Sequence, residues 1–297
     1  MGKGMRLSRG DRVFHAVNAC FMAFIVIVVL YPLYYVVAAS ITDPTVVGNG
    51  KPLLYPTKLF FEGYKAAFGY EPLLNGYRNS LVYTTLGTAV NLLFTIPGAY
   101  ALSRNDMAGR KAIMILYTFT MFFSGGMIPF YMLMRSLRFI DTIWVMILPG
   151  AVSVYNLIVV RTFFQSNISD EILEAAKIDG SSDFRFFFKI VLPLSSTIIA
   201  VMIIFYAVGH WNSYFNAIMY LNGREKMPLQ AVLRDLLILN TITTDMRLSQ
   251  TEAANRIRRA DQLKYCVIVL ASVPVMVMYP FAQKYFTQGV MVGSIKG

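Results

Sequence analysis

The sequence predicts an all-α, polytopic membrane protein with about six transmembrane helices. Of its 297 residues, 56% are hydrophobic and only 14% are charged, whereas a soluble domain of this length carries about 25% charged residues. The mean hydropathy is +0.54. Long stretches without any charged residue recur along the chain, and a helix needs roughly 20 such residues to cross a hydrocarbon core. Because these stretches do not alternate polar and apolar residues as barrel strands do, helices are expected.

Six uncharged stretches define the predicted spans. They cover residues 13–42, 79–103, 112–134, 142–160, 190–223 and 265–283. Two of them are longer than one span requires, so shorter helices are expected inside them. The connections are a long polar loop at 43–78, a short basic turn at 104–111, a short turn at 135–141, a polar segment at 161–189, a long polar region at 224–264 and a tail at 284–297. We therefore expect one transmembrane domain that covers residues 1–297.

Charge and cysteine usage exclude several classes of protein. The formal net charge of +11 is typical of basic loops that face anionic lipid head groups, and no basic cluster interleaved with aromatic residues points to a nucleic acid. Cys20 and Cys266 each lie in an apolar stretch, and His15 and His210 are the only histidines. The sequence therefore predicts no disulfide framework, no metal site and no catalytic residues. The first apolar stretch is too long for the core of a signal peptide and is expected to be a retained span.

Residues 169–193, between the fourth and fifth predicted spans, carry seven residues at a distinctive spacing: Glu174, Ala175, Ala176, Gly180, Ile190, Leu192 and Pro193. Ser169 can cap a helix that starts with two acidic residues, where the helix dipole favours negative charge. Gly180 can end this helix in a left-handed conformation. Pro193 is tolerated in the first turn of the next span. The segment is thus expected to be a short helix, a turn and an entry into the membrane.

This spacing resembles the EAA loop of the permease subunits of bacterial ABC importers, and we call residues 169–193 the EAA segment. The chain is similar over nearly its whole length to the carbohydrate-uptake branch, on the side of the MalG-like subunits. Further matching pieces are Gly126-Met127-Ile128-Pro129, Asp141-Thr142 with Pro149, Ile178-Asp179-Gly180, Trp211-Asn212, Pro228-Leu229-Gln230 and the end 289–297. Within that branch it resembles permeases for larger or plant- and alga-derived oligosaccharides.

The resemblance implies that the EAA segment docks on a separate ATP-hydrolysing subunit. Alanines let a helix approach a partner groove closely, and Glu174 offers a partner arginine a charge-assisted hydrogen bond. Gly180 gives a sharp turn, so that the docked helix and the following span would move as a rigid unit. The alternative is an amphipathic helix that lies in the membrane interface with solvated charges.

The resemblance also implies a set of partners. They are a second, different permease subunit, two ABC ATPase subunits, an extracytoplasmic sugar-binding protein and the lipid bilayer. The chain has no phosphate-binding loop of the Gly-x-x-x-x-Gly-Lys-Ser/Thr type, so ATP and Mg would be bound by the partner ATPases, and this chain would be neither an enzyme nor a cofactor carrier. Transport would proceed by alternating access.

Orientation follows from the EAA segment and not from charge. Lysine and arginine residues divide almost equally between the two sides, so the positive-inside rule does not decide. Docking on an ATPase requires a cytoplasmic EAA segment, and six spans then place both termini in the cytoplasm and the 224–264 loop outside. The predicted location is the bacterial inner, or plasma, membrane.

A tentative substrate path lies near the end of the fifth span. Aromatic faces stack on sugar rings and amides bond their hydroxyls, and both kinds of side chain gather in Trp211, Asn212, Tyr214 and Asn216, with a weaker pair in Tyr155 and Asn156. An interfacial aromatic belt explains the same residues equally well. The arginines of the 224–264 loop could dock an acidic binding protein or attract anionic sugars, or they could form a solvated helix face.

Two other classes compete with an ABC permease. A secondary transporter or channel that works alone would need charged residues inside the membrane for ion coupling, and the six stretches lack them. A structural membrane scaffold leaves the EAA spacing unexplained.

Overall fold

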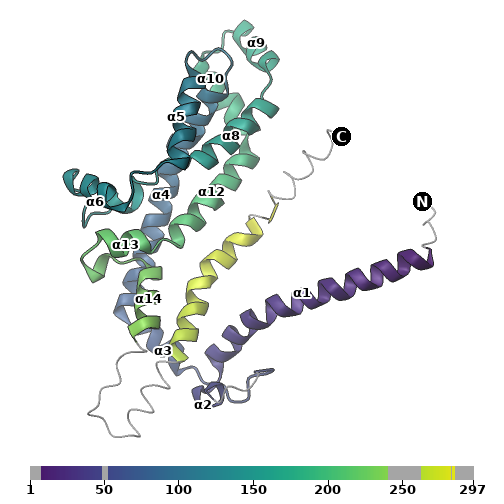
Figure 1. Cartoon of the computed structure of the whole chain (residues 1–297), viewed down its shortest axis with the longest axis vertical. Coiled ribbons are helices and arrows are strands. Elements are labelled where there is room, and N and C mark those ends of the chain that lie inside the picture. Colours follow the sequence, from purple (N-terminus) through teal and green to yellow (C-terminus); the bar gives the residue numbers. More distant parts are fainter. Residues whose placement is uncertain (1–7, 49–52, 240–261, 282, 285–297) are drawn as a thin grey trace. The chain divides into compact units, whose positions relative to one another are not determined.

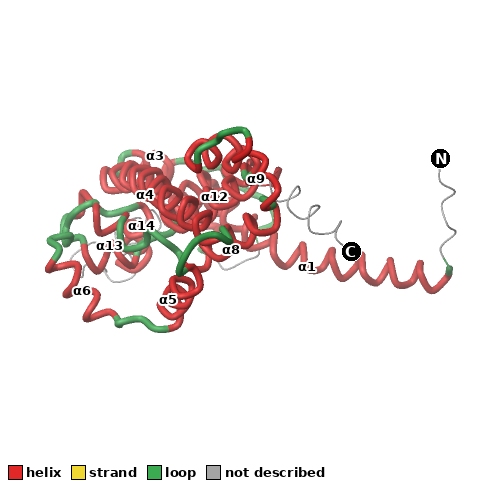
Figure 2. Tube along the Cα trace, turned by 90° about the horizontal axis from the view of Figure 1, so that it is seen from above, coloured by secondary structure: helices red, strands yellow, loops and turns green. Residues whose placement is uncertain are grey.

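The structure is a computed structural model that describes residues 8–48, 53–239, 262–281 and 283–284. Helices are the only extended regular elements in these ranges, and a single isolated bridge joins Thr42 to Leu59 (Figure 1, Figure 2). The chain divides into two compact units: residues 1–69 with 236–270, and residues 70–235 with 271–297.

The first unit is built on a long apolar helix. Its elements are α1 (Arg9–Ile41), α2 (Pro44–Val47), α3 (Glu62–Phe68) and the first half of the helix Gln262–Phe281. Ser8 starts α1 with a capping box: its hydroxyl accepts a hydrogen bond from the Asp11 amide at 3.2 Å, and Asp11 Oδ2 accepts one from the Ser8 amide at 2.9 Å. Most apolar side chains of α1 are exposed within the chain, as expected for a helix covered by lipid or by another subunit.

Gln262 joins three parts of the first unit. Its Nε2 donates to the Phe60 carbonyl at 2.8 Å, and its Oε1 accepts from the Gly63 amide at 3.2 Å. Cys266, one turn later, is free and buried, and its thiol donates to the Ser40 carbonyl at 3.3 Å. A Cβ at Gly63 would lie 2.8 Å from Cys266 Sγ, so glycine is required for this close approach.

The second unit is organised around α4 (Glu71–Ser103). Buried residues recur along α4 at intervals of three or four, as on one face of a helix, and α4 packs most extensively against α12 and α8. The other elements are α5 (Arg110–Phe122), α6 (Met127–Ser136), α7 (Trp144–Ile147), α8 (Val154–Asn167), α9 (Asp170–Ile178), α10 (Asp183–Phe186), the π-helix η1 (Phe187–Val191), α11 (Leu192–Leu194), α12 (Ser196–Trp211), α13 (Phe215–Tyr220), the 3-10 helix η2 (Arg224–Lys226) and α14 (Leu229–Leu239).

Loop residues before α14 are hydrogen-bonded to the first half of α4. Asn79 Nδ2 donates to the Glu225 and Met227 carbonyls, at 2.7 and 3.0 Å, and the Tyr83 hydroxyl donates to the Lys226 carbonyl at 2.8 Å. Ser80 Oγ accepts from the Leu229 amide at 2.9 Å. The last of these bonds satisfies the first amide of α14, one of the groups that a helix start leaves unpaired.

The spans differ in detail from the six that the sequence predicts. In the described residues, three helices are long and apolar enough to cross a membrane, Arg9–Ile41, Glu71–Ser103 and Gln262–Phe281, and five spans result if each of two bent helix pairs counts as one. The third predicted span is broken between α5 and α6 by a bend of 114°. The fourth is divided between α7 and the 14-residue α8. The predicted loop 43–78 contains α2, α3 and the start of α4. Helix α4 can begin before Pro72 because a proline is accommodated in the first turn of a helix.

The long polar region 224–264 contains η2 and α14, as expected for a loop with its own helices. Arg234 lies on α14 and pairs with Asp235 at 3.7 Å. The other arginines singled out from the sequence, Arg247, Arg256, Arg258 and Arg259, lie outside the described residues, as does the tail 285–297.

Candidate functional site

The first half of the EAA segment is the helix α9. It begins directly after Ser169, as predicted, although the Ser169 side chain makes no capping hydrogen bond. It ends at Gly180, whose φ of +74° is the left-handed conformation predicted for it. The Gly180 amide donates to the Lys177 carbonyl at 3.0 Å and the Ser181 amide to the Ala176 carbonyl at 2.9 Å. This pair of bonds is the Schellman motif, which ends a helix sharply.

The second half of the EAA segment is irregular. Ser182 caps α10 by accepting a hydrogen bond from the Arg185 amide at 3.3 Å. The chain then passes through the π-helix η1, a feature that is rare and frequent at functional sites, and Pro193 follows in α11. Between Asp183–Leu194 and Ser196–Trp211 the helix axis bends by 78°. The fifth span therefore does not run straight from residue 190, because the backbone leaves the helical conformation at Ser195, between the two pieces.

The EAA segment has one face on the helix bundle and one face that no described residue covers. Ala176 is buried in α9, and Phe186, Phe187 and Val191 are buried with it in the cluster formed by α4 and α8. Glu174 and Ala175 are exposed. Two apolar side chains are exposed as well, Ile178 at 87% and Phe184 at 78%. A carboxylate beside exposed apolar side chains is a surface suited to another protein.

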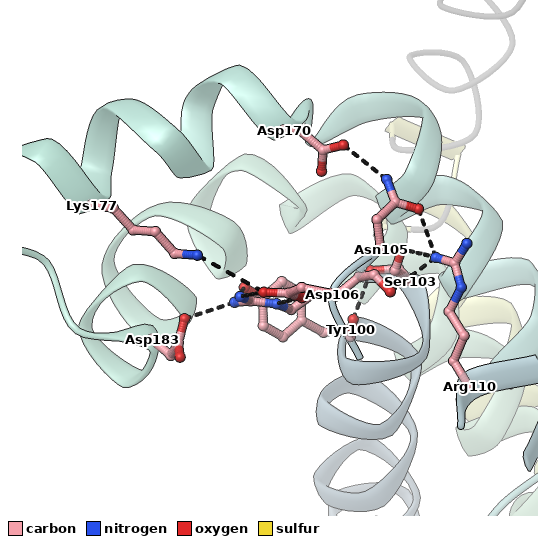
Figure 3. Close-up of polar contacts among 9 residues, drawn as sticks. Tyr100, Ser103, Asn105, Asp106, Arg110, Asp170, Lys177 and Asp183 are labelled. Carbon is pink, nitrogen blue, oxygen red and sulfur yellow. Dashed lines mark hydrogen bonds and ion pairs between the residues drawn. The ribbon is translucent and has the colours of Figure 1, made fainter. Parts of the chain in front are cut away.

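Polar side chains also hold the EAA segment to the turn between α4 and α5. Arg104 forms an ion pair with Asp183 of α10 at 2.8 Å, Lys177 of α9 lies 3.9 Å from Asp106, and Asn105 Nδ2 donates to Asp170 Oδ2 at 2.8 Å. Figure 3 shows Asp170, Lys177 and Asp183 around the turn that carries Asn105 and Asp106. The hydrogen bond from Arg104 lowers the pKa of the Asp106 carboxyl from its usual 3.8 to about 2. Both groups are thus fully charged at neutral pH.

The side chains predicted to form a substrate path lie in three different environments. Trp211 is 1% exposed, and its indole Nε1 donates to the Ala271 carbonyl at 3.1 Å. Its ring packs edge-on against Tyr77, with centroids 6.1 Å apart. Asn212 and Tyr214 are exposed, and Asn216 is half-buried. Trp211 therefore packs inside the second unit, whereas Asn212 and Tyr214 have free surface.

The weaker predicted pair is also split between two environments. Tyr155 is 58% exposed, whereas Asn156, the next residue in α8, is buried. Since neighbouring helix residues point about 100° apart, these two side chains do not line one surface together. Their role in the substrate path stays a prediction.

Asn91 of α4 makes hydrogen bonds to other parts of the bundle. Its Oδ1 lies 2.7 Å from His210 Nε2 of α12, and its Nδ2 donates to the Gly150 carbonyl. One turn further along, Thr95 Oγ1 and the Tyr206 hydroxyl are 2.7 Å apart. These two polar pairs fasten α4 and α12 to each other.

Sequence reasoning missed the contribution of Arg104, Asp106 and Asp183 to this site. The basic turn at 104–111 was a visible signal, because three basic residues interrupt two apolar spans. What the sequence does not indicate is that this turn contacts the EAA segment, 79 positions further along for the pair Arg104 and Asp183. Arg161 donates from Nε to the Leu102 carbonyl at 2.9 Å, near the end of α4.

Comparison with known proteins gives one consistent result. Residues 2–292 match the family described as "Binding-protein-dependent transport system inner membrane component". The chain is 40% identical over 288 residues to a polygalacturonan/rhamnogalacturonan transport system permease protein, YtcP, of Bacillus subtilis, covering 97% of this chain and 99% of that protein. It is 38% identical over 293 residues to protein LplC of the same organism, covering 99% and 98%.

A solved structure agrees with these relatives. A chain from the crystal structure of a bacterial ABC transporter involved in the import of the acidic polysaccharide alginate is 32% identical to this one. The two structures superpose with a TM-score of 0.85, covering 95% of this chain and 99% of the other. The similarity therefore extends over essentially the whole length in both sequence and fold.

Proposed function

Because the chain belongs to the family of binding-protein-dependent transport system inner membrane components, we propose that it is a permease subunit of an ATP-driven importer whose ATPase docks on the EAA segment. Its relatives are permeases of sugar and oligosaccharide ABC transport systems. The chain would supply the membrane passage, and separate subunits that bind ATP and Mg would supply the energy.

One observation carries the coupling role. Glu174 and Ala175 are exposed while Ala176, on the same helix, is buried in the bundle. An exposed carboxylate one helical turn from the exposed Ile178 offers an ATPase subunit a charge-assisted hydrogen bond beside apolar contact area, to which the exposed Phe184 of α10 adds. An interfacial helix would have its apolar side chains in lipid, and Glu174 would then have no partner.

The proposed partners and orientation follow from this docking. A second permease subunit would cover part of the exposed apolar helix surface, two ATPases would bind on the cytoplasmic side, and an extracytoplasmic binding protein would deliver the sugar. Both termini would then be cytoplasmic and the 224–264 loop extracytoplasmic. The location would be the bacterial plasma membrane.

The proposed substrate is an oligosaccharide, with acidic oligosaccharides as the first to test. One relative is named for polygalacturonan and rhamnogalacturonan, and the similar solved transporter imports alginate. Both polymers contain sugar carboxylates. Asn212, Tyr214 and Tyr155 are the predicted path residues with exposed side chains.

The decisive experiment is reconstitution. The chain would be purified with its partner permease and ATPases, inserted into lipid vesicles with the binding protein added, and supplied with ATP and galacturonate oligosaccharides. Glu174→Lys should reduce ATP-dependent uptake at least about tenfold, because reversing one member of a buried charge pair costs 2 kcal/mol or more, while the subunit still assembles.

The matched control is Glu225→Lys, which reverses another exposed carboxylate in a different loop, on η2. It should leave uptake within about twofold of wild type, since an isolated exposed charge contributes little. Wild-type uptake in the Glu174 variant would refute docking through this residue. Sugar flux down a gradient by the chain alone, without any ATPase, would instead establish a secondary transporter or channel.

A further inference from the structure

The covalent link between α9 and the membrane bundle is poorly suited to transmitting force by itself. A left-handed glycine, a π-helix, a proline and a 78° bend lie between α9 and α12. Each of these interrupts the regular hydrogen bonding that makes a helix stiff. A displacement of α9 would therefore reach α12 weakly unless other contacts hold the EAA segment to the bundle.

The α4–α5 turn supplies such contacts at three places. Asn105 bonds Asp170 at the start of α9, Asp106 faces Lys177 at its end, and Arg104 pairs with Asp183 at the start of α10. Figure 3 shows these partners converging on one turn from both helices of the EAA segment. The position of both helices is thus defined relative to the end of α4.

Arg104 is the central residue of these contacts. Its Nε donates to Asp106 Oδ1 at 2.8 Å, a second guanidinium nitrogen pairs with Asp106 Oδ2, and NH1 donates to Asp183 Oδ1 at 2.8 Å and to the Tyr100 hydroxyl at 3.1 Å. The side chain is only 14% exposed, and its guanidinium carbon lies 5.9 Å from the centre of the Tyr100 ring. A planar fork that serves two carboxylates at once is a geometry that lysine cannot reproduce.

The turn itself is held in shape by Arg110. Its NH1 donates to the Arg104 carbonyl at 2.9 Å and to Asn105 Oδ1 at 2.8 Å. Asn105 therefore donates to Asp170 while its own oxygen is fixed by Arg110. This arrangement makes the turn a rigid base for the EAA segment.

We propose that Arg104 is a positioning residue that fastens the EAA segment to α4, so that movement of the docked segment displaces α4 together with α12. The two helices are already tied to each other through Asn91 with His210 and Thr95 with Tyr206. Force would then enter the bundle by two routes: along the chain into α12, and through Arg104 into α4. This inference rests on the proposed function, because it assigns Arg104 a part in ATP coupling.

The test measures the number of ATP molecules hydrolysed per sugar imported, in vesicles that contain the whole transporter. Arg104→Gln should raise this ratio about fivefold or more, the usual lower bound for a coupling between two sites. Arg104→Lys should give a smaller increase, because it keeps the charge and loses the fork. Asp183→Asn should resemble Arg104→Gln, and the double variant should be no worse than Arg104→Gln alone, since both remove one interaction.

The matched control is Arg161→Gln. Arg161 is also an arginine bonded to the end of α4, through the Leu102 carbonyl, and its side chain makes no hydrogen bond to the EAA segment among the described residues. Its ratio should stay within about twofold of wild type. An equal rise in the Arg161 and Arg104 variants would overturn the proposal, because loosening the end of α4 would then explain both.

Two further outcomes count against the proposal. One is a wild-type ratio in Arg104→Gln, and the other is an additive effect in the double variant. If Arg104→Gln does not assemble, Asp183→Asn decides, since it leaves the bonds between Arg104 and Asp106 intact, and an unchanged ratio there refutes the fastening role. Failure of the proposed function has a different signature, namely uptake by the wild-type complex that needs no ATP.

Discussion

The two ends of α12 use polar and aromatic side chains in opposite ways. At the end that the EAA segment enters, Glu174, Ile178 and Phe184 are exposed and have no role in packing within the described chain. At the other end, Trp211 and His210 are bonded to Ala271 and Asn91 inside the bundle. Side chains with free surface are the ones available to a partner or a substrate. The comparison therefore assigns the exposed side chains of the first end to docking and the buried Trp211 and His210 of the second end to stability, and substitutions at both ends can test it.

The largest effect on transport is expected from Gly180→Val. The φ of +74° is strained for a β-branched residue by about 1–2 kcal/mol or more. No atom lies within 4 Å of the new Cβ, so the expected effect comes from backbone strain and not from a steric clash at the Cβ. The turn after α9 should lose its shape. We expect ATP-dependent uptake, measured in reconstituted vesicles, to fall at least about tenfold.

Gly126→Val is the control for this prediction. Gly126 also has a positive φ, +84°, and open space around its Cβ, but it lies at the bend between α5 and α6. Both variants should lower the amount of folded subunit. Only the Gly180 variant should raise the ATP hydrolysed per sugar, and an equal rise in both would remove the distinction between the EAA segment and other strained turns.

The largest effect on stability is expected from Trp211→Ala. Truncating a buried tryptophan costs about 3–5 kcal/mol in the free energy of unfolding, and here it also leaves the Ala271 carbonyl without its donor. Thermal unfolding of the purified subunit in detergent should shift strongly downward. Tyr214→Ala, at a residue that is 44% exposed, should shift it little. Unchanged stability with an altered sugar dependence in the Trp211 variant would instead support direct stacking on the sugar.

Local chemistry explains which features the sequence could predict. Gly180 permits a left-handed backbone because it has no Cβ, and Pro193 fixes its own φ through its ring, so their effects follow from residue type. The left-handed turn at Gly180 is confirmed. Span breaks were missed because a count of uncharged residues does not register backbone geometry. Gly125 and Gly126, followed by Pro129, mark the 114° bend in a run that is otherwise uniformly apolar.

Contacts between residues that are far apart in the chain could not be predicted from the sequence, for a different reason. The pairing of Arg104 with Asp183 depends on which helices pack together, and no local rule gives that. Trp211 shows the same limit, because an aromatic residue near a span end suits a sugar site, a membrane belt or a packed interior equally well. Only its bond to Ala271 places it in the interior.

A smaller loss of stability is expected from Gly87→Ala, because a side chain of α12 lies directly against Gly87 of α4. A Cβ at Gly87 would collide with the imidazole ring of His210. His210 would have to rotate and release Asn91, and an unpaired buried amide costs about 1–3 kcal/mol. Thermal unfolding should therefore occur at lower temperature. The double variant Gly87→Ala/His210→Ala should be no less stable than His210→Ala alone, because the ring that the new Cβ would collide with is gone.

Gly98→Ala provides the comparison on the same helix. Its new Cβ would lie 3.8 Å from Leu157 Cδ1, an ordinary contact, and alanine is favoured over glycine in a helix by up to about 1 kcal/mol. This variant should be neutral or more stable. A destabilised Gly98 variant would mean that an added Cβ destabilises α4 even where it makes only an ordinary contact. The loss in the Gly87 variant would then not be evidence for a collision with His210.

The smallest effect is expected at Asp141, in the turn between α6 and α7. Asp141 Oδ2 pairs with Lys226 Nζ at 2.6 Å, and Oδ1 accepts from the Asn222 amide at 3.0 Å. Its φ of +58° is one that asparagine also adopts readily. Asp141→Asn should therefore keep the backbone and lose only the ion pair, for about 0.2–1 kcal/mol. Asp141→Val should cost more, because a β-branched side chain is strained at this φ.

The pH dependence separates the charge at Asp141 from its shape. The hydrogen bonds from Lys226 and the Asn222 amide lower the pKa of the Asp141 carboxyl below its usual 3.8. Its contribution is therefore complete above pH 3.8 and is lost as the pH falls through the lowered pKa. The stability difference between wild type and Asp141→Asn should be constant from pH 8 to pH 5 and shrink in stronger acid. A difference that instead varied between pH 8 and pH 5 would show that Asp141 acts through a group other than Lys226.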